Sequence, residues 1–257
     1  MHHAYIDRFA QGHSPVHRLD ARGKLLAVLA YSGVLISFNR YAVSELAAMV
    51  VMPLAMLWFG RVPVGFALRR VIILGPFILM LAMISPLYDT SLHPVVLGPW
   101  RFAIAGGFLT AADVAVKFAL GVLALTAMTC TTPFALLLEA MRKLFMPKLL
   151  VMQLGFLYRY IFVLIDEAMR IRRARDFRGA AAAPPGRKLA AAGGVIGSLF
   201  VRTLERSERI HVAMGARGYR GEPHSLSRLH FGPGDVVFLI VTVAYLAACR
   251  LAYPLIL

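Results

Sequence analysis

The sequence predicts an all-α membrane protein with about five transmembrane helices and a water-facing module of amphipathic helices. Of its 257 residues, 59% are hydrophobic, and the mean hydropathy is +0.70. A soluble core of this size needs far fewer apolar residues, so the chain is expected to lie in a lipid bilayer. The formal net charge of +15 is then expected in loops on one side of the membrane, because basic residues favour the cytoplasmic side.

Five apolar stretches predict the transmembrane helices, at residues 25–38, 42–59, 71–88, 109–130 and 233–253. Asp20 stands where it can cap the first of these helices. That helix is shorter than the ~20 residues that a span needs, so Lys24 and Arg22 are expected to extend toward the interface. In the fourth stretch, Asp113 and Lys117 stand one helical turn apart and are expected to pair.

The segments between the spans are predicted as loops. Residues 60–70 carry three arginines and are expected on the inner side of the membrane. Residues 89–107 are rich in proline and glycine and are expected on the outer side. Pro76 and Pro86 are expected to kink the third helix.

The segment 132–232 differs in character and is predicted to be a cytoplasmic module. It holds 17 of the 28 basic residues against 7 acidic ones. Residues 149–165 are apolar enough to suggest a further span, but a crossing there would place one of two flanking basic clusters outside. An amphipathic helix is therefore predicted. The chain is thus divided into 1–131, with the N-terminal tail and four spans, then 132–232, and 233–257, with the last span.

Two long helices are predicted in the module. A break with Pro184 and Pro185 separates them. The second helix opens with small residues at a spacing that is expected to let another helix approach closely: Gly193, Gly194, Gly197 and Ser198.

A short phrase occurs twice in the module, each time at the end of a stretch with helical periodicity. Ala174-Arg175-Asp176-Phe177-Arg178-Gly179 recurs 42 positions later as Ala216-Arg217-Gly218-Tyr219-Arg220-Gly221. Arginine followed by glycine suits the C-terminus of a helix, which is enough to explain one copy. Two copies are better explained by a partner that is itself present twice. The two helices are therefore predicted to end in the same way.

The chain resembles the transmembrane T component of energy-coupling factor importers. The likeness lies in the paired phrase, in the residues ahead of each copy, and in an N-terminal signature at residues 14–24. Ala21 stands where this signature usually has proline, and Asp176 replaces the glycine of the family's Ala-Arg-Gly. The resemblance covers nearly the full length. It is closest to the cobalt branch, the CbiQ-like proteins, with the nickel branch as the alternative.

The resemblance implies a coupling function and a set of partners. These are two ABC-type ATPase subunits and a substrate-binding membrane subunit, with a small accessory membrane subunit as a further candidate. Each ATPase would receive the end of one coupling helix, and the chain would lie in the prokaryotic cytoplasmic membrane with its N-terminus and module in the cytoplasm. The coupling residues implied are Ala174, Arg175, Asp176, Ala216, Arg217 and Gly218, with Arg178 and Arg220 as flanking contacts.

Other classes of function have less support in the sequence. The apolar stretches hold few ionisable groups, and no phosphate-binding glycine loop is present, so neither catalysis nor ATP binding is expected on this chain. No cofactor or metal site is expected either, because Cys130 and Cys249 lie in separate apolar runs. The alternative is a membrane anchor whose basic module binds anionic lipid or nucleic acid, although the resemblance implies no nucleic acid. Such binding would weaken steeply with salt.

Overall fold

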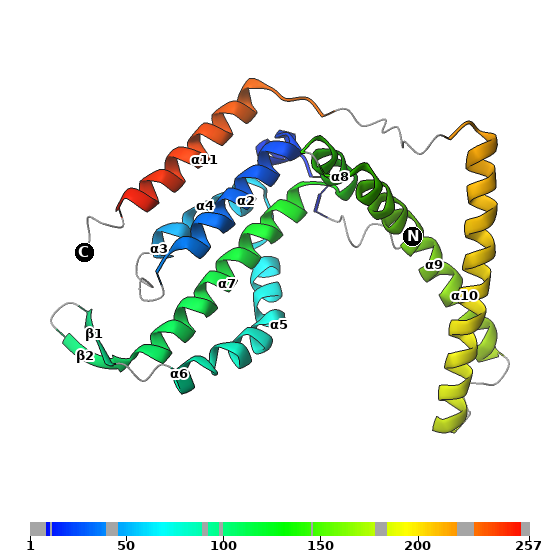
Figure 1. Cartoon of the computed structure of the whole chain (residues 1–257), viewed down its shortest axis with the longest axis horizontal. Coiled ribbons are helices and arrows are strands. Elements are labelled where there is room, and N and C mark those ends of the chain that lie inside the picture. The colour runs from blue at the N-terminus through cyan, green and yellow to red at the C-terminus, as the bar shows by residue number, and fades with distance from the viewer. Residues whose placement is uncertain are drawn as a thin grey trace. The chain divides into compact units, whose positions relative to one another are not determined.

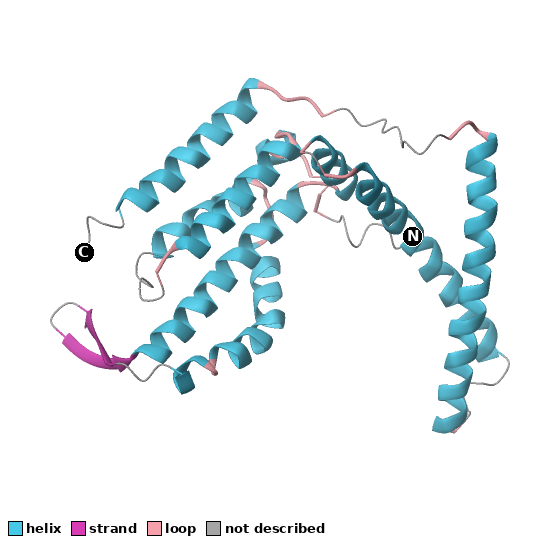
Figure 2. Ribbon diagram, in the orientation of Figure 1, coloured by secondary structure: helices cyan, strands magenta, loops and turns pink. Residues whose placement is uncertain are grey.

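The structure is a computed structural model that describes residues 9–10, 12–39, 46–88, 92–97, 100–144, 146–177, 184–219 and 229–252. These residues are helical almost throughout, with one small β-hairpin (Figures 1 and 2). The chain divides into two compact units. One unit contains residues 141–228 and is called the hairpin unit after its two long helices. The larger unit contains residues 5–140 together with 229–257, and the β-hairpin belongs to it.

In the larger unit, α7 is the central helix. It packs against α2, α4, α5 and α6, while α2 also packs against α11. The two strands pair antiparallel, with Leu92 opposite Ala105. In chain order the elements of this unit are α1 (Pro15–Arg18), α2 (Ala21–Ser37), α3 (Leu46–Met49), α4 (Val51–Phe59), α5 (Val64–Ala82), α6 (Ser85–Tyr88), β1 (Leu92–Leu97), β2 (Trp100–Ala105), α7 (Gly106–Thr131) and α11 (Pro233–Ala252), and α8 (Phe134–Lys143) crosses the boundary between the units.

The core of the larger unit lies where α2, α3, α4 and α7 meet. Tyr31 and Met49 are fully buried, and the Tyr31 hydroxyl donates a hydrogen bond of 2.9 Å to the Met49 carbonyl. On α7, Ala124 and Ala127 are fully buried. Their small side chains suit the close contact of α7 with its neighbours. Elsewhere on α7, Asp113 forms the predicted ion pair with Lys117 at 2.9 Å.

A buried polar junction joins the ends of α2, α7 and α11. Asp20 caps α2 as predicted, because its carboxylate accepts the Arg22 backbone N–H at 2.8 Å. The Asp20 backbone N–H donates to Asp235 on α11 at 2.6 Å. Lys24 is 1% exposed and donates to the Thr131 carbonyl at the end of α7 at 2.8 Å. The prediction that Lys24 extends toward the membrane interface is therefore wrong, because its ammonium group binds a buried carbonyl at the end of α7 that has no acceptor role within the helix.

Acid is expected to destabilise this junction through Asp20. Burial alone raises the pKa of Asp20, but hydrogen bonds from the Arg22 side chain and backbone, with the charges of Arg22 and Lys24, hold the pKa below its usual value. The stabilisation by ionised Asp20 is thus fully present above the unfolded pKa of about 3.9 and is lost as pH falls through the lower folded value. Unfolding midpoints of the detergent-solubilised chain, measured between about pH 6 and pH 3, should show this dependence. In Asp20→Asn it should flatten.

Two predicted loops are partly regular structure. α5 begins at Val64, so Arg69 and Arg70 lie within the helix instead of in an inner loop. The Arg70 guanidinium lies over the Phe66 ring, 4.9 Å from its centroid. This cation–π interaction stabilises the positive charge on the helix. The expected outer loop contains β1 and β2, whose pairing satisfies backbone groups that an irregular loop would leave to water. α5 continues through Pro76 and bends along its length (Figure 1).

Fewer helices than predicted are long and apolar enough to cross a membrane. Three in the described parts of the chain meet that requirement: α7, α9 (Lys148–Phe177) and α11. α2 has 17 residues, about 26 Å of helix, which is less than a hydrocarbon core of about 30 Å. The second predicted span is divided at Val50 into α3 and α4. α9 contains the stretch predicted to be amphipathic, and its location relative to the membrane stays a prediction.

The hairpin unit is built from two long helices, α9 and α10 (Pro185–Ala216), that lie side by side (Figure 1). Pro184 precedes α10 and Pro185 occupies its first turn, where the missing N–H of proline costs no helical hydrogen bond. Apart from the neighbouring turns of α10 itself, no heavy atom of the described chain lies within 4 Å of a Cβ placed at Gly193, Gly194 or Gly197. The prediction that these glycines allow close helix packing is therefore not met within this chain.

Candidate functional site

The described part of the first copy of the repeated phrase, residues 174–177, lies at the end of α9. Ala174, Arg175 and Asp176 are all helical, and the helix ends at Phe177, whose side chain is 90% exposed. The Arg175 guanidinium approaches the neighbouring Asp176 carboxylate at 3.5 Å, and Arg172 approaches the same carboxylate at 3.9 Å. Both distances are long for charge-assisted hydrogen bonds, so Asp176 holds these arginines weakly.

Arg175 retains unused hydrogen-bonding capacity. Its side chain is 27% exposed, and its Nε is buried without a hydrogen-bond partner among the described residues. A buried donor without an acceptor is costly, and a planar guanidinium can bind a carboxylate through two parallel hydrogen bonds. Together with the exposed Phe177 ring, Arg175 forms the combination of arginine and aromatic side chain that is enriched at the centres of protein interfaces.

The described part of the second copy, residues 216–219, begins at the last residue of α10 and continues beyond the helix. Ala216 is the last helical residue, Arg217 is the C-cap, and Gly218 follows with a φ of +78°. The Gly218 N–H donates to the Gly215 carbonyl and the Tyr219 N–H donates to the Met214 carbonyl, both at 3.0 Å. This pair of hydrogen bonds is the Schellman motif, in which a left-handed glycine closes the helix.

The two copies therefore end their helices differently, and the prediction of identical ends is wrong. Gly218 allows the left-handed conformation that stops α10, whereas Asp176 occupies the equivalent position in α9 and remains helical. The Arg217 side chain is exposed, and no hydrogen bond or ion pair links it to another described residue. The predicted flanking contacts Arg178 and Arg220 lie outside the described residues.

Replacing Gly218 with alanine is expected to destabilise the end of α10 by about 1 kcal/mol, because a Cβ disfavours the left-handed conformation. Gly215→Ala is the matched control. Gly215 is helical with open space around its Cα, so alanine is accommodated there and favours the helix. Amide hydrogen exchange at Tyr219 should accelerate in Gly218→Ala and not in Gly215→Ala. Equal exchange in both variants would contradict the cap described above.

Contacts along the whole hairpin establish that α9 and α10 are antiparallel. The Tyr219 hydroxyl donates to the Met152 sulfur, near the start of α9. Midway along, Arg202 and Glu167 form an ion pair at 2.8 Å. Near the end of α9, Arg175 and Gly194 line the same hollow of about 530 Å³. The N-terminal part of α10 thus lies beside the C-terminal end of α9.

The two motif arginines consequently lie at opposite ends of the hairpin. Arg175 is level with Gly194, and Arg217 follows Gly194 by 23 positions along α10. At 1.5 Å per helical residue, this is a separation of about 35 Å. One small binding site cannot contact both arginines. Each of them can meet a separate partner.

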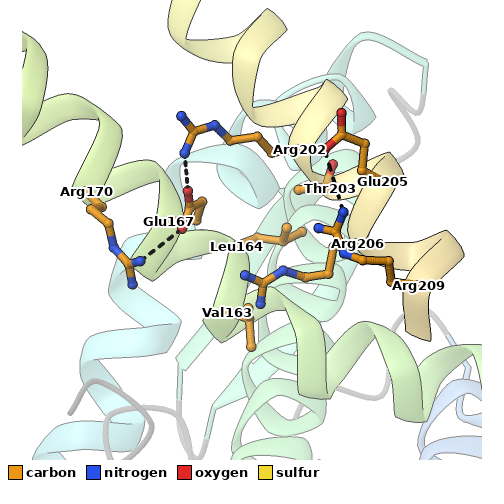
Figure 3. Close-up of a pocket in the computed structure, with 9 residues that line it drawn as sticks. All are labelled: Val163, Leu164, Glu167, Arg170, Arg202, Thr203, Glu205, Arg206 and Arg209. Atoms are coloured by element: carbon orange, nitrogen blue, oxygen red, sulfur yellow. Dashed lines mark hydrogen bonds and ion pairs between the residues drawn. The ribbon is translucent and has the colours of Figure 1, made fainter. Parts of the chain in front are cut away.

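The middle of the hairpin contains a charged hollow that the sequence reasoning missed. This central hollow has a volume of about 360 Å³ and lies between α9 and α10 (Figure 3). The signal in the sequence was the recurrence of charges three and four positions apart, but this pattern is also typical of a solvated helix face. The hollow is lined by Glu167, Arg170, Arg202, Glu205, Arg206 and Arg209, together with Val163, Leu164 and Thr203.

Comparisons with known proteins place the chain among membrane transport proteins. Residues 12–227 match the family model CbiQ, described as cobalt transport protein. The chain is 29% identical over 260 residues to the energy-coupling factor transporter transmembrane protein EcfT of Bacillus subtilis (strain 168), covering 95% of each chain. It is 27% identical over 228 residues to EcfT of Lacticaseibacillus paracasei, covering 84% of this chain and 85% of that protein.

A second kind of relative belongs to the cobalt branch. The chain is 29% identical over 155 residues to the cobalt transport protein CbiQ of Salmonella typhimurium (strain LT2), covering 57% of this chain and 68% of that protein. The family match spans most of the chain, including both copies of the repeated phrase and the whole N-terminal signature. The chain therefore belongs to the CbiQ family of cobalt transport proteins and is an EcfT/CbiQ-like multi-pass membrane component of an energy-coupling factor transporter.

Proposed function

We propose that the chain couples ATP hydrolysis in two identical ABC-type ATPase subunits to substrate uptake by a separate membrane subunit. Arg175 docks into one ATPase and Arg217 into the other. ATP is bound and hydrolysed by these partners, and this chain transmits their movement to the substrate-binding subunit, itself catalysing no reaction. Ala174, Asp176, Ala216 and Gly218 position the two arginines, and Arg178 and Arg220 are flanking contacts.

The separation of the motif arginines carries this proposal. Arg175 and Arg217 lie at opposite ends of a hairpin, about 35 Å apart, and Asp176 neutralises the first only weakly. A contact that stabilised the fold of this chain would need a strong acceptor within the chain. Among the described residues neither guanidinium has a strong acceptor. Their separation therefore suits two copies of one partner, each of which offers a carboxylate.

Arginine also suits a joint that transmits force. Its planar fork can keep two hydrogen bonds to a carboxylate while the partner subunit moves, which constrains direction as well as distance. Lysine would keep the charge and lose the fork. We further propose the cytoplasmic membrane of a prokaryote as the location, with the N-terminus and the hairpin unit on the cytoplasmic side, because the basic residues concentrate there.

Cobalt is the proposed substrate, because the matched family and the Salmonella relative are described as cobalt transport proteins. Nickel is the alternative. Selectivity is assigned to the substrate-binding subunit, so this chain need not contact the ion.

Copurification tests the assembly. The affinity-tagged chain, extracted from its native membrane in mild detergent, is expected to carry two ATP-binding-cassette subunits per copy, together with at least one further membrane protein. Quantitative mass spectrometry of the purified complex measures this ratio. The ATPases should remain bound at a salt concentration that removes loosely held lipid or nucleic acid. A chain that copurifies with no ATPase, or that loses it at modest salt, would favour the membrane-anchor alternative.

A further inference from the structure

The central hollow of the hairpin unit carries more positive charge than its own carboxylates balance. Glu167, which is 13% exposed, is shared by Arg202 at 2.8 Å and Arg170 at 3.6 Å (Figure 3). Glu205 pairs with Arg209 at 3.8 Å. Four guanidinium groups and two carboxylates leave a net charge of +2 in the hollow.

Arg206 is the guanidinium in the hollow that is most open to a partner. Its side chain is exposed, and no hydrogen bond or ion pair connects it to another described residue. A guanidinium that lines a concave surface without an acceptor can bind an incoming anion without first breaking a contact within the chain. The ligand of the hollow is therefore expected to be anionic and to carry about two negative charges.

The hollow lies halfway between the two motif arginines. Arg206 is 11 positions before Arg217 in α10 and 12 positions after Gly194, which is level with Arg175. These distances along the helix are about 17 Å and 18 Å. Two identical partners docked at the two ends of the hairpin would be related by a two-fold axis, because each partner presents the same groove to one motif arginine. This axis would pass near the midpoint between Arg175 and Arg217.

The apolar side chains of the hairpin favour a protein over a lipid as the occupant. At 100° per residue, exposed Ile161 and Ile165 point away from Glu167 and Arg170 on α9, and exposed Phe200 and Leu204 point away from Arg202 and Arg206 on α10. If the apolar side contacts membrane or membrane proteins, the hollow opens toward water. Apart from Val163 and Leu164, the lining of the hollow is charged or polar, so an acyl chain attached to an anionic headgroup would find little apolar surface there.

We infer that the central hollow binds two acidic side chains, one from each of the two ATPase subunits, where those subunits meet. The inference rests on the proposed function, since it requires two copies of the partner. Identical subunits bring identical carboxylates to their two-fold axis, and two like charges there repel one another unless a cation lies between them. The net charge of +2 in the hollow matches the charge of such a pair. The hollow thus holds the two copies together, while Arg175 and Arg217 hold each of them separately.

Binding of the purified ATPases to the full-length chain in detergent tests this inference, with charge-neutral variants of single residues. Arg206→Gln should weaken association roughly tenfold, the loss expected for one charge-assisted hydrogen bond. Glu205→Gln frees Arg209 and raises the charge of the hollow, so it should tighten association, an effect that misfolding does not produce. Arg173→Gln is the matched control, since Arg173 is exposed on α9 and lies outside the hollow. It should leave association within about twofold of the original.

The outcomes separate this inference from the proposed function. Unchanged association in Arg206→Gln, together with loss in Arg175→Ala and Arg217→Ala, would overturn the central contact and leave the coupling role intact. Loss in Arg173→Gln equal to that in Arg206→Gln would also overturn it, because the attraction would then be diffuse. So would binding of an anionic phospholipid that depends on Arg206 and competes with the ATPases. Normal association in all motif variants would contradict the proposed function itself.

Discussion

Replacing Arg175 or Arg217 with alanine is expected to weaken association with the ATPase subunits by more than a hundredfold and to abolish uptake of the transported ion. Truncating an arginine that is desolvated in its complex leaves the partner carboxylate buried and unpaired, at a cost of roughly 3 to 5 kcal/mol. An exposed pair at the rim of an interface would cost only about 0.2 to 1 kcal/mol. ATPase binding and ion uptake are measured separately for each variant.

Lysine variants distinguish the effect of the two-hydrogen-bond geometry of the guanidinium from the effect of its charge. Arg175→Lys and Arg217→Lys keep a positive charge at each helix end, so association should fall less than in the alanine variants. Uptake should still be impaired, because a single ammonium group does not fix the direction of the contact. Arg173→Ala is the control for general loss of charge near the first motif, and it should behave like the original chain. Near-normal uptake in both alanine variants would rule out the coupling role.

Asp235→Ala is expected to lower the free energy of unfolding of the larger unit by roughly 2 to 4 kcal/mol. The Asp235 carboxylate accepts the Asp20 backbone N–H at 2.6 Å and the Gly232 N–H at 2.8 Å. Both donors would lose their acceptor, and buried Lys24 would lose a nearby negative charge. Denaturant unfolding of the solubilised chain measures the loss, and hydrogen exchange at the Asp20 amide locates it.

The matched variant for this position is Asp235→Asn. An asparagine oxygen can still accept the Asp20 N–H, while the charge is removed, so the destabilisation should be about half as large. Unfolding unchanged in Asp235→Ala would show that the contact between α2 and α11 does not depend on this carboxylate. The result also bears on the N-terminal signature, because Asp20 and Lys24 belong to it and both serve the junction.

Several expectations from the sequence are confirmed, and each rests on a local pattern. Asp20 caps α2, Asp113 pairs with Lys117, and α7 and α11 are long and apolar enough to cross a membrane. A cap requires one side chain and the backbone two or three residues on, and an ion pair within a helix requires only the 3.6-residue period. Such features are encoded by neighbouring residues, so they can be predicted from the sequence.

The errors concern residues whose surroundings come from elsewhere in the chain. Lys24 was expected at the interface because the sequence shows an amine beside an apolar run, but its partner is the Thr131 carbonyl, 107 residues away. The glycines of α10 were expected to contact another helix, and their spacing does not tell which chain supplies it. The second predicted span was expected to be one helix, but α3 and α4 divide a stretch whose composition is continuous.

The sequence by itself determined that this is a helical membrane protein of the energy-coupling factor type with two arginine-tipped helices. Hydropathy, helical period and a repeated phrase are all carried by residues close together in the chain. The tertiary structure alone decided that α9 and α10 are antiparallel, that Arg175 and Arg217 lie at opposite ends, and that charges from both helices meet midway. These properties depend on the register of two helices against each other. Register follows from the packing of side chains far apart in sequence, which a linear pattern does not contain.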